Sequence, residues 1–429
     1  MTLDRRQFLV RSGLLGASGA ATAGGELLGA GAAEARPRPG RDLLQADGPL
    51  QLSRVADPGA RLPAVPFHGI HQAGIVTPAP PAGCFAAFDV HAAGRSQLVD
   101  LLQTLTGTAR FLTAGGRPPS AGAGAPAADS GTLGPVVPAD GLTVTLGAGA
   151  SLFDRRYGLA ARKPAGLFAM ASFPDDHLDH ARCGGDLMLS ICAGSADTAT
   201  HALREIARRT RGAMGIRWRI DGFVSPARPT GVPRNHQGFK DGIANPDVRR
   251  LQVAERLLWH DGGRGGQAWT AGGTYHVIRA IRMFTEAWDE LPVGQQERIV
   301  GRRRDSGAPL SGRVETDAPD YAADPHGRVT PLRAHIRLAN PRTRHTEGSR
   351  ILRRSFNYDR GVDARGRLDM GLIFNCYQRD IRRQFEAVQA RLRNEPMARF
   401  ISPFGGGYFF TLPGVRDPSD WYGSGLLGT

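Results

Sequence analysis

Lysine is almost missing from this chain of 429 residues. Of its 54 Lys and Arg residues, only Lys163 and Lys240 are lysines, and the formal net charge is +14. A chain with this charge invites a nucleic-acid partner. However, the arginines are scattered among 40 acidic residues, and we find no recognition motif that combines basic and aromatic side chains. The charge therefore indicates a compositional bias, and we expect no nucleic-acid partner.

Cysteine is scarce as well. None of the four cysteines belongs to a CxxC pair, which argues against a zinc knuckle, an iron–sulfur site or a thioredoxin-like motif. The absence of CxxCH excludes covalent attachment of a c-type haem. Because two of the four lie in apolar runs, we expect buried free thiols. The cysteines are Cys84, Cys183, Cys192 and Cys376.

Hydrophobic runs long enough to span a membrane are missing beyond the N-terminus. The first residues combine the basic pair Arg5-Arg6 with a weakly apolar stretch that is interrupted by Glu26, followed by small residues around Ala35. This layout predicts a signal peptide over 1–35, and RRQFL resembles the twin-arginine export motif. We expect the export machinery as a partner and no stable membrane span. The mature protein would be extracellular, cell-wall-associated or periplasmic.

Hydrophobic periodicity predicts an α+β protein built from two similar halves. After a linker or arm at 36–65, the first half, 66–230, reads as strand–helix–strand twice over. Its predicted elements are strands 84–92, 142–149, 186–193 and 215–223 with helices 94–105 and 195–210. This is the order of a ferredoxin-like domain, which has an antiparallel sheet.

The second half, 231–429, repeats that order. Its predicted strands are 274–284, 350–358, 370–378 and 405–413, and its predicted helices are 285–300, with a break at Pro292, and 379–393. The sequence thus predicts two ferredoxin-like domains that arise from duplication.

Three segments stand out as candidates for chemistry: GFKDGIANP (238–246), HIRLANPR (335–342) and RILRRSF (350–356). Taken singly, each has a simpler interpretation. Asp241 between glycines is typical of a turn. His335 beside apolar residues is typical of a structural histidine, and Arg353 with Arg354 of a solvated charge pair.

Together, these segments resemble the dye-decolorising (DyP-type) haem peroxidases, because GFKDG is an instance of the family's GxxDG signature. The resemblance extends to HQAGI (71–75), DSGAPL (305–310) and FISPFGGGYFFTLPGV (400–415), and it covers about 69–415. The branch it resembles most includes exported deferrochelatase/peroxidases. The family implies two ferredoxin-like domains and one non-covalent haem b per chain, held mainly by the C-terminal domain.

The resemblance also implies roles for single residues. His335 matches the proximal ligand of the haem iron, and Glu395 is our candidate for the carboxylate that contacts its imidazole. Asp241 matches the distal aspartate, which moves a proton between the two oxygens of peroxide. Arg353 matches the distal arginine, a fixed positive charge, with Arg354 as an alternative.

Further residues are predicted to contact the haem. Glycines near Asp241 would let the backbone approach the porphyrin closely. An arginine after His335 would pair with a propionate. The predicted haem contacts are Gly238, Gly242, Ile243, Ala244, Asn340, Pro341, Arg342 and Phe374.

The function implied is oxidation of dyes, phenols and other small aromatic one-electron donors by hydrogen peroxide, through an oxoferryl intermediate. A second enzymatic hypothesis is deferrochelatase, which removes iron from haem and leaves the porphyrin intact. A third is a haem carrier without turnover, which would need His335 but not the pair Asp241 and Arg353. The sequence leaves the oligomeric state open, a homo-oligomer included.

Overall fold

The computed structural model describes residues 62–119, 122, 124–263 and 267–428. The predicted signal peptide and most of the predicted arm at 36–65 lie outside these residues. Within the described ranges, no helix combines the length and the apolar character needed to cross a bilayer. All four cysteines are free and three of them are buried, as the sequence predicts.

The first half of the chain forms a four-stranded antiparallel sheet with two helices. Its strands lie in the order β2-β3-β1-β4, with every neighbouring pair antiparallel. This is the strand order of a ferredoxin-like fold. The elements are β1 (Ala82–Val90), α1 (Arg95–Ala114), β2 (Thr143–Gly149), β3 (Leu187–Ala193), α2 (Ala196–Arg209) and β4 (Met214–Phe223).

The second half repeats the topology, with strands in the order β9-β5-β8-β7, again all antiparallel. The predicted α+β class with two ferredoxin-like halves is confirmed, whereas the boundary between residues 230 and 231 stays a prediction. The elements are β5 (Thr274–Met283), α4 (Thr285–Asp289), α5 (Val293–Val300), β7 (Phe356–Val362), β8 (Leu368–Gln378), the π-helical turn η6 (Arg382–Glu386), α7 (Ala387–Leu392) and β9 (Ile401–Thr411).

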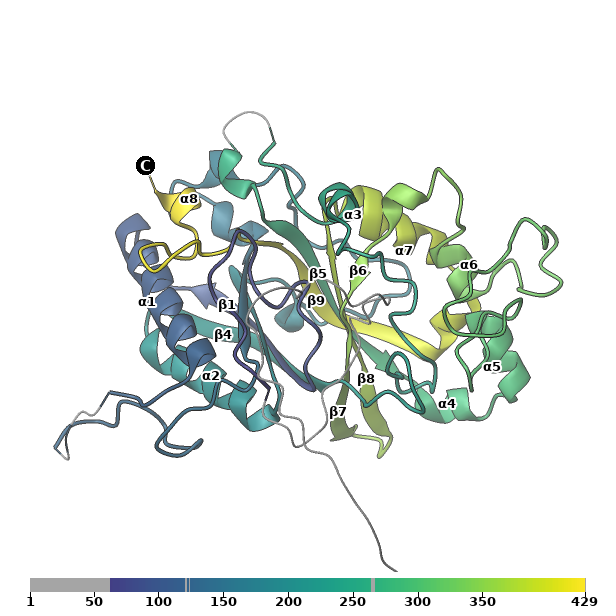
Figure 1. Ribbon diagram of the computed structural model, residues 1–429, viewed down its shortest axis with the longest axis horizontal. Helices are drawn as coiled ribbons and strands as arrows, with labels where there is room; N and C mark the ends of the chain where they lie inside the picture. The colour runs from purple at the N-terminus through teal and green to yellow at the C-terminus, as the bar shows by residue number, and fades with distance from the viewer. Residues whose placement is uncertain (1–61, 120–121, 123, 264–266, 429) are drawn as a thin grey trace, which may run out of the picture. The chain divides into compact units, whose positions relative to one another are not determined.

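Two seams join the halves into a closed ring of eight strands. At one seam β2 pairs with β9 over Gly147–Gly149, and at the other Phe223 of β4 pairs with Asn357 of β7. A ninth strand, β6 (Leu352–Arg353), adds to β8. In Figure 1, α1 and α2 lie on one side of the strands and α4 to α7 on the other.

Both faces of β1, β2 and β3 are buried, whereas one face of β4 and the end of β7 are exposed. Cys84, Ala86 and Phe88 of β1 pack in the core that contains α1 and α2, whereas Phe85 and Ala87 pack in a second core with residues of both halves. Because consecutive side chains of a strand point to opposite faces, this alternation accounts for the uninterrupted apolar runs in the sequence.

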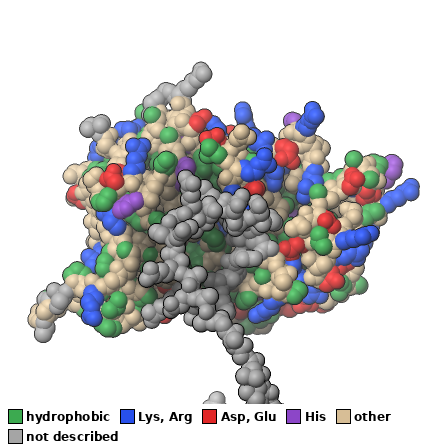
Figure 2. All heavy atoms as spheres, viewed as in Figure 1, with side chains coloured by type: hydrophobic (Ala, Val, Ile, Leu, Met, Phe, Trp, Pro, Cys, Tyr) green, Lys and Arg blue, Asp and Glu red, His purple; other side chains and the backbone are tan. Residues whose placement is uncertain are grey.

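Several connections lie outside the ring, and some of them hold the residues of the candidate site described below. They comprise the loop 231–250, α3 (Leu251–Leu257), α6 (His335–Ala339) and α8 (Ser424–Leu427), with short 3-10 turns at 150–153, 160–162, 180–182, 268–270, 347–349 and 396–400. On the face shown in Figure 2, basic and acidic side chains are interspersed.

Two predicted elements differ from the structure. The predicted strand 350–358 is divided into β6 and β7, because the buried side chain of Arg354 turns away to bind the carbonyl oxygens of Gly74 and Thr77 at 2.7 and 2.9 Å. The predicted helix 94–105 continues to Ala114 and ends only at Gly115, whose φ of 70° suits glycine. The predicted break at Pro292 is confirmed.

Candidate active site

A large cavity opens in the second half of the chain. It encloses about 1730 Å³ of space free of protein atoms, its opening to solvent included. Polar residues reach it from the loop 231–250, α6, β6 and the segment after α7. The apolar part of its wall includes Ile243, Ala244, Ile336, Leu372, Phe374, Phe385 and Met397. A mostly apolar wall with a few polar groups is typical of a cofactor site.

His335, the first residue of α6, lines this cavity, and its imidazole contacts Glu395. The Nδ1 nitrogen lies 2.8 Å from Oε2 of that carboxylate, which is buried at the start of the 3-10 turn 396–400. Because a carboxylate accepts, Nδ1 carries a hydrogen, and Nε2 is the nitrogen left to bind a ligand. Burial lowers the pKa of His335, but the charge and hydrogen bond of Glu395 outweigh it, so that the pKa is raised.

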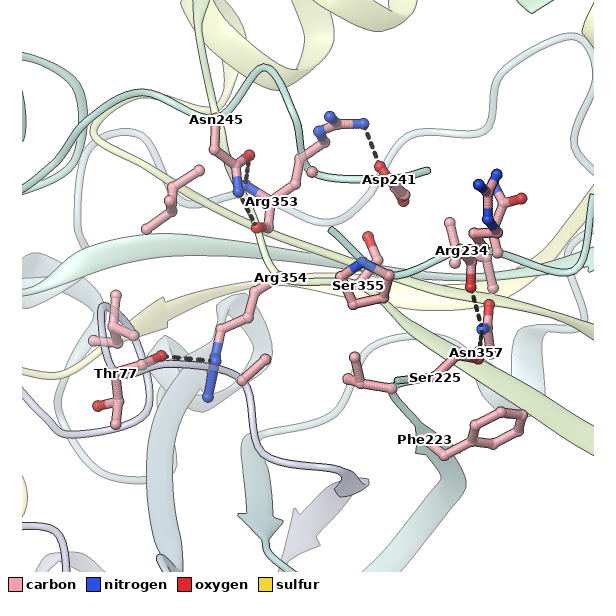
Figure 3. Close-up of a pocket in the computed structure, with 18 residues that line it drawn as sticks. Thr77, Phe223, Ser225, Arg234, Asp241, Asn245, Arg353, Arg354, Ser355 and Asn357 are labelled. Atoms are coloured by element: carbon pink, nitrogen blue, oxygen red, sulfur yellow. Dashed lines mark hydrogen bonds and ion pairs between the residues drawn. The ribbon is translucent and has the colours of Figure 1, made fainter. Parts of the chain in front are cut away.

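Asp241 and Arg353 form an ion pair on the wall of the same cavity. A guanidinium nitrogen of Arg353 lies 2.8 Å from Oδ1 of Asp241, and each side chain is about one fifth to one quarter exposed. The backbone of Arg353 is fixed by Asn245, whose side-chain amide accepts from its N–H at 3.0 Å and donates to its carbonyl at 2.8 Å (Figure 3). The guanidinium is thus held facing the carboxylate.

A second, smaller cavity shares Asp241 and Arg353 with the first (Figure 3). It encloses about 670 Å³, its opening included, and Ser355 and Asn357 lie on its wall. Within the described chain, the buried hydroxyl of Ser355 has no hydrogen-bond partner. Arg354 is directed away from Asp241 toward Thr77, so Arg353 and not Arg354 is the arginine that contacts the aspartate.

Two arginines and a tyrosine also line the main cavity, namely Arg302, Arg342 and Tyr321. Arg302 is buried, which lowers its pKa to about 10, and it donates to the carbonyl of Gly307 at 2.7 Å. Burial raises the pKa of Tyr321 to about 12, and among the described residues its buried hydroxyl has no hydrogen-bond partner. These donors suit an anionic ligand such as a carboxylate.

Most of the predicted haem contacts reach the main cavity. Those on its wall are Ile243, Ala244, Asn340, Arg342 and Phe374. Three others are placed elsewhere. Gly242 lines the second cavity, Pro341 lines neither cavity, and Gly238 lies in a turn with a φ of 83° where a side chain would meet Arg304. Residue 238 is therefore a glycine because of its backbone conformation, and not because it contacts a ligand.

Comparison with known proteins identifies the family. The model of the N-terminal domain of DyP-type peroxidases matches residues 72–224, and that of the C-terminal domain matches residues 232–416. The chain belongs to the DyP-type peroxidase family. Deferrochelatases from Yersinia pestis and Escherichia coli K12 are each 47% identical to it, over 84% and 86% of this chain and 84% and 89% of theirs.

Solved structures agree with this family. A DyP-type peroxidase from Cellulomonas bogoriensis is 38% identical, with a TM-score of 0.77 over 87% of this chain and 100% of that one. Ferric DtpA from Streptomyces lividans is 36% identical, with a TM-score of 0.77 over 87% and 99%. DyP-type peroxidases are haem-dependent oxidoreductases, and haem is the cofactor of this protein.

The residues of the main cavity fit a haem. The Nε2 nitrogen of His335 suits the iron, the apolar wall suits the porphyrin, and the hydroxyl of Tyr321, which has no partner among the described residues, suits the propionates together with Arg302 and Arg342. The sequence alone did not point to Arg302, Tyr321 or Asn245. Only Asn245 could have been noticed, since it lies in the same motif as Asp241.

Proposed function

We propose that this DyP-type peroxidase uses hydrogen peroxide to oxidise dyes, phenols and other small aromatic donors, with Asp241 and Arg353 as its catalytic pair and His335 as the iron ligand. The observation that carries this proposal is the 2.8 Å contact between Asp241 and Arg353 on the wall of the cavity that also contains His335. Haem, when bound, supplies the iron at which peroxide is reduced and the place where its oxidising equivalents are kept.

The protein's part in the reaction is to bind peroxide and move one proton. The carboxylate of Asp241 accepts a proton from one peroxide oxygen and returns it to the other, which then leaves as water. Arg353 stays protonated and stabilises negative charge that develops on the oxygens. Glu395 keeps Nδ1 of His335 hydrogen-bonded, so that Nε2 would bind the iron of a haem with increased basicity.

A second candidate function is deferrochelatase. It is favoured by one observation, that relatives 47% identical over most of both chains carry that name. The two functions differ in their products. The haem-loaded protein is incubated with peroxide and an aromatic dye, and separately with a reductant and an iron(II) chelator.

Oxidised dye, with haem still intact, supports the peroxidase. Iron-free porphyrin, recovered by chromatography in amounts exceeding one per protein when haem is supplied, supports the deferrochelatase. If neither product forms, the protein carries haem without turnover, and the proposal is overturned. The variant Asp247→Ala is a matched control, because this exposed carboxylate lies in the same loop as Asp241 but outside both cavities.

We further propose that the protein is exported by the twin-arginine route to an extracellular, cell-wall-associated or periplasmic location. The support is the basic pair Arg5-Arg6 ahead of an apolar stretch, followed by small residues around Ala35. Replacing both arginines by lysine should keep the full-length precursor inside the cell. Export at an unchanged level would contradict this route.

A further inference from the structure

A second cluster of metal-ligating side chains lies in the first half of the chain, apart from both cavities. His201 and Glu205 are four residues apart on α2, so both lie on one face of that helix. Asp129 comes from the long connection between α1 and β2. One ligand atom from each residue lies within 4.8 Å of the others.

The cluster is buried, which is unusual for two carboxylates and an imidazole. His201 and Glu205 are each only 2% exposed, and the side chain of Asp129 is 9% exposed. The imidazole Nε2 lies 2.8 Å from Oδ2 of Asp129. Side chains of these types are rarely buried together unless they are paired or bind a metal.

Charge in the cluster does not balance when His201 is neutral. Among the described residues, Arg208 is the cation that forms an ion pair with the cluster, through Glu205, and one third of the Arg208 side chain is exposed. Two carboxylates against one guanidinium leave an excess of one negative charge. A bound cation would compensate for it.

We propose that Asp129, His201 and Glu205 bind a first-row divalent cation such as Zn²⁺. One imidazole and two carboxylates match the ligands that Zn²⁺ takes in proteins, whereas Ca²⁺ and Mg²⁺ prefer oxygen alone. Tetrahedral ligands at about 2.0–2.2 Å from the ion lie about 3.4 Å apart, so small side-chain rotations suffice. As the ion enters, any proton on Nε2 is released to solvent and the bond to Asp129 is replaced by two bonds to the metal.

The ion would fix the connection between α1 and β2 onto α2. That connection already contacts the cluster, since the N–H of Ser130 donates to Oε1 of Glu205 at 2.9 Å and Arg208 donates to the carbonyl of Ala128. Because a metal that binds only the folded state stabilises it, Zn²⁺ should raise the melting temperature. The site is independent of the haem cavity, so peroxidase activity should not depend on it.

The test is calorimetric titration of Zn²⁺ into the full haem-loaded chain after treatment with a chelator. We expect one ion per chain with a Kd of about 1 µM or tighter, proton release on binding, and no competition from Mg²⁺. Asp129→Asn and His201→Gln should weaken binding at least about tenfold. His91→Ala is the control, because this histidine of the same half is exposed.

Folding of each variant is checked by its haem absorption band and its rate with peroxide, both of which should match the wild type. Asp129→Asn is the deciding variant, since the side chain lies in a connection outside the helix and the change keeps its shape. Equal affinity in wild type and Asp129→Asn, or no binding in either, would overturn the proposal. The cluster would then be a set of hydrogen-bonded side chains that binds no metal.

Discussion

Glu395 places its Oε2 atom 2.8 Å from Nδ1 of His335, although 60 residues separate the two in the sequence. The carboxylate is buried, and His335 starts α6 on the wall of the main cavity. A carboxylate bonded to an imidazole fixes the tautomer and makes the free nitrogen a stronger donor to a metal. The pair therefore links the electronic properties of the haem site to a residue outside the motif that contains His335.

Replacing Glu395 by glutamine should weaken this effect. Gln keeps the shape and still accepts a hydrogen bond, but it removes the negative charge. We expect haem affinity or peroxidase activity to fall about 10–100-fold, and the reduction potential of the iron to rise because the ferric state loses electron donation. Potentiometric titration measures the reduction potential, and haem transfer to a scavenger protein measures the haem affinity. An unchanged potential, with the exposed Glu290→Gln as control, would contradict the role of Glu395.

Asn245 should act through the position of Arg353. Its two hydrogen bonds to the backbone of Arg353 are lost in Asn245→Ala. Each bond contributes about 1 kcal/mol, so we expect the reaction with peroxide to slow by up to about thirtyfold, while haem content and the KM for the dye stay unchanged. Stopped-flow and steady-state kinetics separate these quantities. A loss of haem, with the peroxide rate per haem unaltered, would show a merely structural role.

Asp186 should give part of the stability at neutral pH. It is buried, accepts from the N–H of Val90 at 2.9 Å, and pairs with Arg156 at 2.9 Å. Burial raises the pKa of Asp186, but the hydrogen bonds from Arg156, Ser151 and Val90 and the charge of Arg156 together outweigh it, so that the pKa is lowered. The stabilisation is therefore complete above the pKa of the unfolded chain, near ~3.9, and is lost as the pH falls through the lower folded value.

Asp186→Asn should accordingly reduce the free energy of unfolding by about 1–3 kcal/mol at pH 7, a modest figure because Arg156 is partly exposed. The difference between variant and wild type should shrink below about pH 4. Urea unfolding at pH 7 and pH 3, followed by circular dichroism, checks both statements. A difference that stays constant over this range would contradict the ionic origin of the effect.

The sequence predicted the order of the elements well, since most ring strands are apolar runs of seven to eleven residues and turn residues separate them. It placed the break at Pro292, because proline lacks the N–H that would continue the helix. It did not reveal the interruption at Arg354. That interruption depends on carbonyl groups near Gly74, which the sequence gives no reason to place beside residue 354.

In the candidate site too, the sequence predicted some residues and missed others. His335, Asp241 and Arg353 belong to short motifs, so they could be named from the sequence. Their neighbours Arg302 and Tyr321 could not, because they lie in irregular segments and reach the cavity only through the tertiary fold. Sequence spacing also could not show that Gly238 serves a turn, since a φ of 83° becomes visible only in the structure.

The central claim is that Asp241, held beside Arg353, moves the proton on which cleavage of peroxide depends. Stopped-flow absorption of the haem-loaded protein, mixed with one equivalent of hydrogen peroxide, tests it most directly. We predict that the Soret band of the wild type changes within milliseconds, and that Asp241→Ala starts from the same spectrum but reacts about 10²–10⁴-fold more slowly. Equal rates in the two proteins, or a wild-type Soret band that does not change, would contradict the account.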